Sequence, residues 1–224
     1  MFNLERLHVF ALKTVIGAFM KRQMGSFLAN VATLVALSSL SVPVWAADTT
    51  HVRGTVASVE GSAIKIKTND GKDVGLTIGN DWKIAGVVPA SLGDVKKGVF
   101  IGTANVQDSS GNKALEVVVF PEKMRGTGEG DYGWDLKPKS SMTNANVEQT
   151  VESLDGATVR LKYKGGEKTV TIAPSTPIVT FADATKDDVK PGAKVFIVGA
   201  PNPDGTMLTK GFIAVGKDGT TPPM

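Results

Sequence analysis

The sequence predicts an all-β protein in which two tandem, small, five-stranded, OB-like β-barrels follow an N-terminal signal peptide. Three observations predict this fold. The second half of the chain repeats the first, both halves alternate apolar and polar residues with a period of two, and the chain has no cysteine. Without disulfides, a small exported unit depends on a hydrophobic core, and a closed barrel provides one without open sheet edges.

The N-terminus has the three parts of a secretory signal. "MKRQMGS" is basic, "FLANVATLVALSSL" is apolar, and "SVPVWA" ends in small residues before Ala47. The apolar run is short for a membrane span, although an uncleaved anchor is the alternative. We therefore assign residues 1–46 to a leader and signal peptide. We expect a periplasmic or secreted protein that contacts the membrane only through this segment, if the signal is uncleaved.

The net charge of +3 comes from this leader. Residues 1–46 hold four of the 25 basic residues and one of the 22 acidic ones, so the remainder carries 21 of each. A nucleic-acid-binding protein needs a basic face to neutralise phosphates. A neutral exported chain therefore predicts no nucleic-acid partner.

The repeat defines the predicted domains. "VRGTVASVEGSAIKIKT" from Val52 matches "VEQTVESLDGATVRLKY" from Val147 at an offset of 95, and further along "DVKKG" matches "DVKPG" at an offset of 94. We expect a first barrel at 47–120, a Gly/Pro-rich linker at 121–146, a second barrel at 147–218 and a tail at 219–224.

Each unit reads as five short strands. Two strands flank a turn at Glu60-Gly61, "VGLTI" or "KTVTI" forms a third, and an irregular crossing precedes the last two. The alternation predicts these residues for the first core: Val56, Ile64, Ile66, Ile78 and Ile101. It predicts these for the second: Val151, Val159, Leu161, Ile172 and Val195.

The pattern V-x-G-x-V-x-x-V-x-G-x-x-I from Val52 to Ile64, with the later D-V-K-x-G turn, resembles a family of bacterial secreted domains of unknown function. The linker words "GEGDYGWDL" and "SSMTNANV" strengthen the resemblance. It implies tandem OB-like β-barrels in the periplasm, and some family members carry a metal ABC transporter permease label. A permease needs several apolar runs of about 20 residues, and this chain has one. Family members often have a histidine where this chain has Asp131.

The residue types argue against an enzyme. Nucleophilic catalysis needs an activated serine or cysteine beside a base, and the only histidine after the leader is His51, close to the predicted cleavage site, where termini usually fray. Zinc and copper sites need clustered Cys and His. We predict no catalytic residue and no cofactor.

A hard cation is the alternative. Glu129, Asp131 and Asp135 place three carboxylates in the Gly-rich stretch "GTGEGDYGWD", and Ca²⁺ accepts oxygen ligands from such loops. The spacing differs from that of an EF-hand. These three residues are the candidate metal ligands of an accessory metal-handling protein.

The aromatic residues carry the main functional hypothesis. Trp82 lies in the first crossing, and Tyr132 and Trp134 follow the glycines of the linker. The three residues predict a platform for a ligand or partner; alternatively, Tyr132 and Trp134 form a clasp that pins the linker between the barrels. The sequence thus predicts an exported, non-catalytic binding or assembly module of the cell envelope, whose partner is an unknown envelope protein or polymer.

Overall fold

The computed structural model describes residues 49–201 and 207–224. The predicted leader and signal peptide, residues 1–46, lie outside them. The described residues all belong to one unit of dense contacts, Val44–Met224. Within them, no helix is long and apolar enough to cross a membrane.

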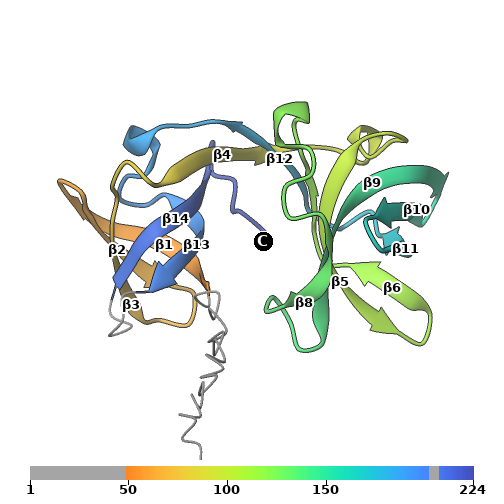
Figure 1. The fold of residues 1–224 in the computed structure, drawn as a ribbon, viewed down its shortest axis with the longest axis horizontal. Helices are drawn as coiled ribbons and strands as arrows, with labels where there is room; N and C mark the ends of the chain where they lie inside the picture. The colour runs from red at the N-terminus through yellow and green to blue at the C-terminus, as the bar shows by residue number, and fades with distance from the viewer. Residues whose placement is uncertain (1–48, 202–206) are drawn as a thin grey trace, which may run out of the picture. The chain divides into compact units, whose positions relative to one another are not determined.

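The all-β prediction is confirmed: the described residues form fourteen strands in one mixed sheet, with short 3-10 helices and no α-helix (Figure 1). The strands that precede the linker are β1 (Thr50–Glu60), β2 (Ala63–Thr68), β3 (Asp73–Thr77), β4 (Lys83–Pro89), β5 (Phe100–Asp108), β6 (Gly111–Ala114) and β7 (Val117–Val119). The later strands are β8 (Gly130–Trp134), β9 (Ser140–Ser153), β10 (Gly156–Tyr163), β11 (Gly166–Ile172), β12 (Ile178–Asp183), β13 (Lys194–Pro201) and β14 (Met207–Gly216). The 3-10 helices are η1 (Leu92–Asp94), η2 (Glu122–Met124) and η3 (Lys186–Asp188).

The predicted hairpin is confirmed, with its turn one residue further along: Gly61 and Ser62 connect the paired residues Glu60 and Ala63. β1 ends at Glu60 and β2 begins at Ala63. Gly61 has φ +63°, a left-handed conformation that glycine adopts without steric cost.

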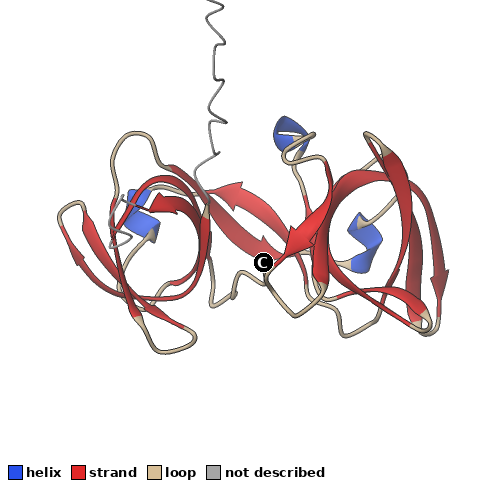
Figure 2. Ribbon diagram, turned by 60° about the horizontal axis from the view of Figure 1, so that its bottom comes forward, coloured by secondary structure: helices blue, strands red, loops and turns tan. Residues whose placement is uncertain are grey.

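Five strands pair in a closed cycle that we call the first ring. β1 pairs with β2 and β13, β2 pairs with β3, β3 pairs with β14, and β14 pairs with β13. Only the contact between β3 and β14 is parallel. Each of the five strands therefore has a neighbour on both sides, and Figure 2 shows them curving round.

A second ring follows the same plan. β9 pairs with β10 and β5, β10 pairs with β11, β11 pairs with β6, and β6 pairs with β5. Here the parallel contact is between β11 and β6. The two rings are thus built from corresponding parts of the two sequence repeats.

The repeats exchange strands. The first ring joins β1–β3 from the first repeat to β13 and β14 from the second, whereas the second ring joins β9–β11 to β5 and β6. The boundaries 47–120 and 147–218 stay a prediction about the sequence repeats, and the strand pairings cross them. Neither repeat closes a ring with its own strands.

Two strands replace the crossings that the sequence predicted to be irregular. β4 and β12 pair with each other antiparallel; β4 also pairs with β14, and β12 with β7. The prediction was wrong here because both strands take partners from the other repeat, which a short apolar run does not reveal. The linker is also less irregular than predicted, since it contains β8 and the start of β9.

Most of the predicted core residues are buried, in two hydrophobic clusters. The first cluster holds four residues predicted for the first core: Val56, Ile64, Ile66 and Ile78. The second cluster holds three residues predicted for the second core: Val159, Leu161 and Ile172. Alternation identified them because every second side chain of a strand points to the same face.

Three core predictions are wrong. Ile101 belongs to the second cluster and Val195 to the first, because β5 and β13 pair with strands of the other repeat. Val151 is 53% exposed. A register shift in the β9–β10 pairing lies between the partners of Val147 and Val151, so the alternation changes face between these two valines.

The buried and exposed valines of this hairpin make a matched pair. Val159→Ala should lower the free energy of unfolding by roughly 2 kcal/mol, because it removes two buried methyl groups and leaves a cavity. Val151→Ala should change it by less than about 0.5 kcal/mol, because the side chain faces solvent. Urea unfolding of both variants measures this difference; equal losses would contradict the register described here.

Candidate functional site

The second half of the Gly-rich stretch "GTGEGDYGWD" forms an edge strand of the sheet. This strand, β8, pairs antiparallel with β9, so that Tyr132 lies opposite Met142 and Trp134 opposite Ser140. The Ser140 hydroxyl donates to the Trp134 carbonyl oxygen at 2.9 Å. These bonds hold the two predicted aromatic residues on a strand that belongs to the same sheet as the second ring.

Trp134 packs against residues of the first ring. Its ring centroid lies 4.3 Å from that of His51 on β1 and 6.1 Å from that of Phe196 on β13. The Arg53 guanidinium lies 5.9 Å from the Trp134 ring and 5.0 Å from the Phe196 ring, within cation–π range. These are the contacts that the clasp hypothesis expects, and Trp134 is half-buried in them.

Asp135 connects the same elements through charge. Its carboxylate accepts hydrogen bonds from both terminal nitrogens of Arg53, at 3.1 and 2.7 Å, and its Oδ1 lies 3.0 Å from Nδ1 of His51. Partial burial works to raise the pKa of Asp135, but the bonds from Arg53 and His51 outweigh it and lower that pKa. His51 is thus held in β1 with its side chain 17% exposed, and the expectation of a frayed histidine is wrong.

The other two predicted aromatic residues differ in their exposure to solvent. Tyr132 is 42% exposed, and its hydroxyl accepts a hydrogen bond from Nδ2 of Asn144. Trp82 is a core residue of the first ring, 7% exposed, whose Nε1 donates to the Thr77 carbonyl at 2.8 Å. Trp82 is therefore wrong as a platform residue, because its indole fills the core instead of the surface.

The three candidate metal ligands have separate partners. Glu129 accepts the backbone N–H of Lys164, Asp131 pairs with the Lys168 ammonium at 2.6 Å, and Asp135 holds Arg53. Partial burial works to raise the pKa of Asp131, but the hydrogen bonds from Lys168 and Thr143 outweigh it and lower that pKa. In the part of the chain that the structure describes, no three His, Cys, Asp or Glu side chains form a group that could hold a metal ion.

The sequence prediction missed Glu116. Its side chain is fully buried, its Oε1 accepts the Ala104 N–H at 3.0 Å, and its Oε2 has no hydrogen-bond partner among the described residues. Burial raises the pKa of this carboxyl to about 7. The sequence feature that could have indicated a buried carboxyl is the position of Glu116 inside the apolar run "ALEVVVF", where a single acidic residue is unusual.

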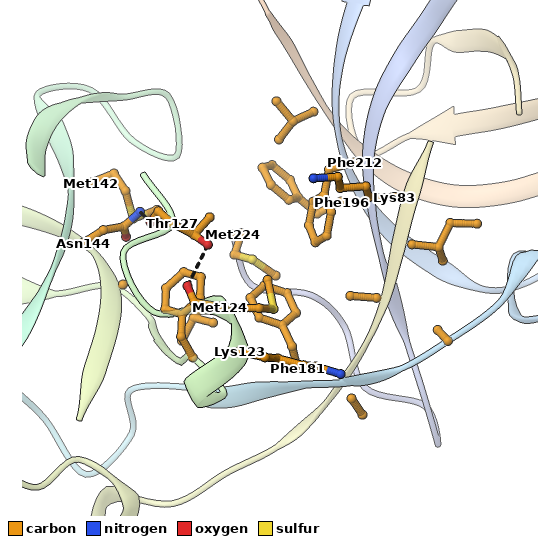
Figure 3. Close-up of a pocket in the computed structure, with 18 of the residues that line it drawn as sticks. Lys83, Lys123, Met124, Thr127, Met142, Asn144, Phe181, Phe196, Phe212 and Met224 are labelled. Atoms are coloured by element: carbon orange, nitrogen blue, oxygen red, sulfur yellow. Dashed lines mark hydrogen bonds between the residues drawn. The ribbon is translucent and has the colours of Figure 1, made fainter. Parts of the chain in front are cut away.

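A cavity of about 580 Å³ lies beside β8 (Figure 3). Its walls come from β4, β12, β13 and β14, from β5, β7, β8 and β9, and from the segment between β7 and β8. Six aromatic side chains line it: Phe120, Tyr132, Trp134, Phe181, Phe196 and Phe212. Three methionines complete much of the apolar wall: Met124, Met142 and Met224.

Polar groups are few at this cavity. Lys83 and Lys123 line it, and Lys123 pairs with Asp183 at 2.7 Å. Among the described residues, Nε1 of Trp134 and Oδ1 of Asn144 are buried atoms without a hydrogen-bond partner, and both residues line the cavity. The site is thus an apolar, mostly aromatic cavity with a few polar atoms in its wall.

A scan against protein-family models found no match to this chain, and neither the curated proteins nor the solved structures gave one.

Proposed function

We propose that the chain is an exported, non-catalytic binding module of the cell envelope whose cavity takes an apolar group of its ligand. The observation that carries the proposal is the aromatic lining of the 580 Å³ cavity. Sites for small ligands commonly have volumes of roughly 300–1,000 Å³ and mostly apolar walls with a few polar groups. In this proposal the two rings are OB-like β-barrels, and the binding surface lies on β8 and the strands that face it.

The lining supports binding rather than catalysis. Lys83 and the Lys123–Asp183 pair are the charged groups that line the cavity. The buried Glu116 is not part of that lining, and His51 is held by Asp135 and Trp134. The proposed role of Tyr132 and Trp134 is therefore to supply aromatic surface, with Trp134 also joining β8 to β1 and β13. The metal-handling alternative is not proposed further, because its three carboxylates are engaged with separate partners.

Filling the cavity should weaken the binding of an apolar probe. Ala85 lines the cavity from β4 and packs against the hydrophobic cluster that holds Phe181, so Ala85→Phe places a ring in that space. We expect the variant to bind the uncharged dye N-phenyl-1-naphthylamine at least roughly tenfold more weakly than the parent chain, because the dye loses the volume it occupies. A fluorescence titration measures the two dissociation constants.

The matched control is Ala63→Phe, an equally large change at an exposed position of β2 that does not line the cavity. It should leave dye binding unchanged. Equal binding by the parent chain and Ala85→Phe, with both variants still folded by thermal melting, would overturn the proposed function.

A further inference from the structure

The segment after β14 turns back sharply onto the sheet. The Thr220 N–H donates to the Lys217 carbonyl at 2.9 Å. A Cβ on Gly216 would lie 1.7 Å from the Thr220 carbonyl oxygen and 3.3 Å from Cδ of Pro222. The chain can therefore fold over the end of β14 only because position 216 has no side chain, and this turn directs residues 221–224 toward the cavity.

This short segment is held like a bound peptide. Thr221 is exposed, whereas Pro222 and Met224 are buried, and Met224 is only 5% exposed. The Met224 side chain packs in a hydrophobic cluster with Phe181 and Phe196, and Figure 3 shows it in the middle of the lining residues. Nε of Arg53 donates to the Met224 main-chain oxygen at 2.5 Å. Met224 is therefore held in two ways, by burial of its side chain and by a hydrogen bond to its main-chain oxygen.

We infer that the cavity is a peptide-binding site occupied in part by the chain's own Thr221–Met224, and that its partner is an extended, proline-containing segment with a large apolar side chain. The inference rests on the proposed binding function of the cavity and names its ligand class. The partner segment takes the place of Pro222 to Met224 and extends into the remaining volume.

The chemistry of the segment fits that role. Two consecutive prolines favour an extended conformation before binding, so that little conformational entropy is lost, and aromatic-lined grooves are the usual receptors for such segments. Methionine is flexible and makes favourable sulfur–aromatic contacts, so it adapts to a wall of phenylalanines. The cavity supplies Phe181 and Phe196 for the apolar side chain, and the Arg53 side chain supplies a donor to the segment's main-chain oxygen.

Tethering makes the segment a competitor of the partner. A short linker holds it near the site at an effective concentration on the order of millimolar, so that a free peptide must compete with it. Removing the segment should therefore expose the site, and the peptide of the same sequence serves as the probe.

The test compares the full chain with a variant that lacks residues 221–224. The probe is the amidated peptide DGTTPPM, which reproduces residues 218–224, and calorimetry gives the dissociation constants. The shortened variant should bind the peptide at least roughly tenfold more tightly than the full chain. The control peptide DGTTPPD should not bind, because it places a charge in the aromatic wall.

A second variant guards against misfolding of the shortened chain. Met224→Asp keeps the full length and removes the apolar side chain from the cavity, so it should also bind DGTTPPM more tightly than the parent. Absence of peptide binding by both variants, or binding equal to that of the full chain, would overturn the inference. If the dye still distinguishes Ala85→Phe while the peptide fails, this inference alone is lost. Failure of the dye test overturns the proposed function itself.

Discussion

Residues 121–224, produced without the preceding part of the chain, are expected to lose cooperative folding. In the intact protein β13 and β14 pair with β1 and β3, and β9 and β11 pair with β5 and β6. The fragment retains only part of each ring, and both hydrophobic clusters lose residues from the missing strands. Two- or three-stranded pieces without a complete core are marginally stable at best.

The measurement is thermal unfolding followed by circular dichroism, on residues 47–120 and 121–224 separately and after mixing. We expect neither fragment to show a cooperative transition and the mixture to regain one, because each fragment carries the strands that the other lacks. The intact chain is the control. A cooperative transition in either fragment alone would show that a repeat can close on its own strands.

Glu116→Gln should remove a pH dependence from the free energy of unfolding. The pKa of Glu116 rises from its usual 4.5 to about 7 in the folded protein, mainly through burial. Between these values the folded state holds a proton that the unfolded state has released, so stability falls as pH rises from 4.5 through about 7 and then levels off. The loss attributable to this carboxyl is about 3 kcal/mol.

Urea unfolding at several pH values measures this effect. Glutamine keeps the Oε1 acceptor for the Ala104 N–H but carries no charge. The variant should match the parent below pH 4.5 and exceed its stability by up to about 3 kcal/mol above pH 7. Glu60→Gln, at an exposed position where β1 ends, is the control and should follow the parent curve. Parallel curves for the parent and Glu116→Gln would contradict the buried environment of this carboxyl.

Part of the candidate site could be predicted from the sequence, and part could not. The clustering of Tyr132, Trp134 and Asp135 outside the repeat predicted that something specific lies there, and the structure places Trp134 and Asp135 against His51 and Arg53. The cavity itself could not be predicted. Its phenylalanines, such as Phe181 and Phe196, read as ordinary strand residues, and they converge only because β12 and β13 are brought together with β8.

The sequence by itself determined the all-β class, the hairpin turn that follows Glu60 and most of the core. These features depend on neighbours in the chain, since alternation and turn residues act over a few positions. Only the tertiary structure decided which repeat supplies the partner of each strand, and hence why Ile101 and Val195 lie in each other's predicted cores. The two repeats present similar strands, so local pattern cannot distinguish a partner from its own repeat from one in the other. β4 leads from β3 of the first ring to β5 of the second, β12 leads from β11 back to β13, and these two strands pair with each other across the repeats.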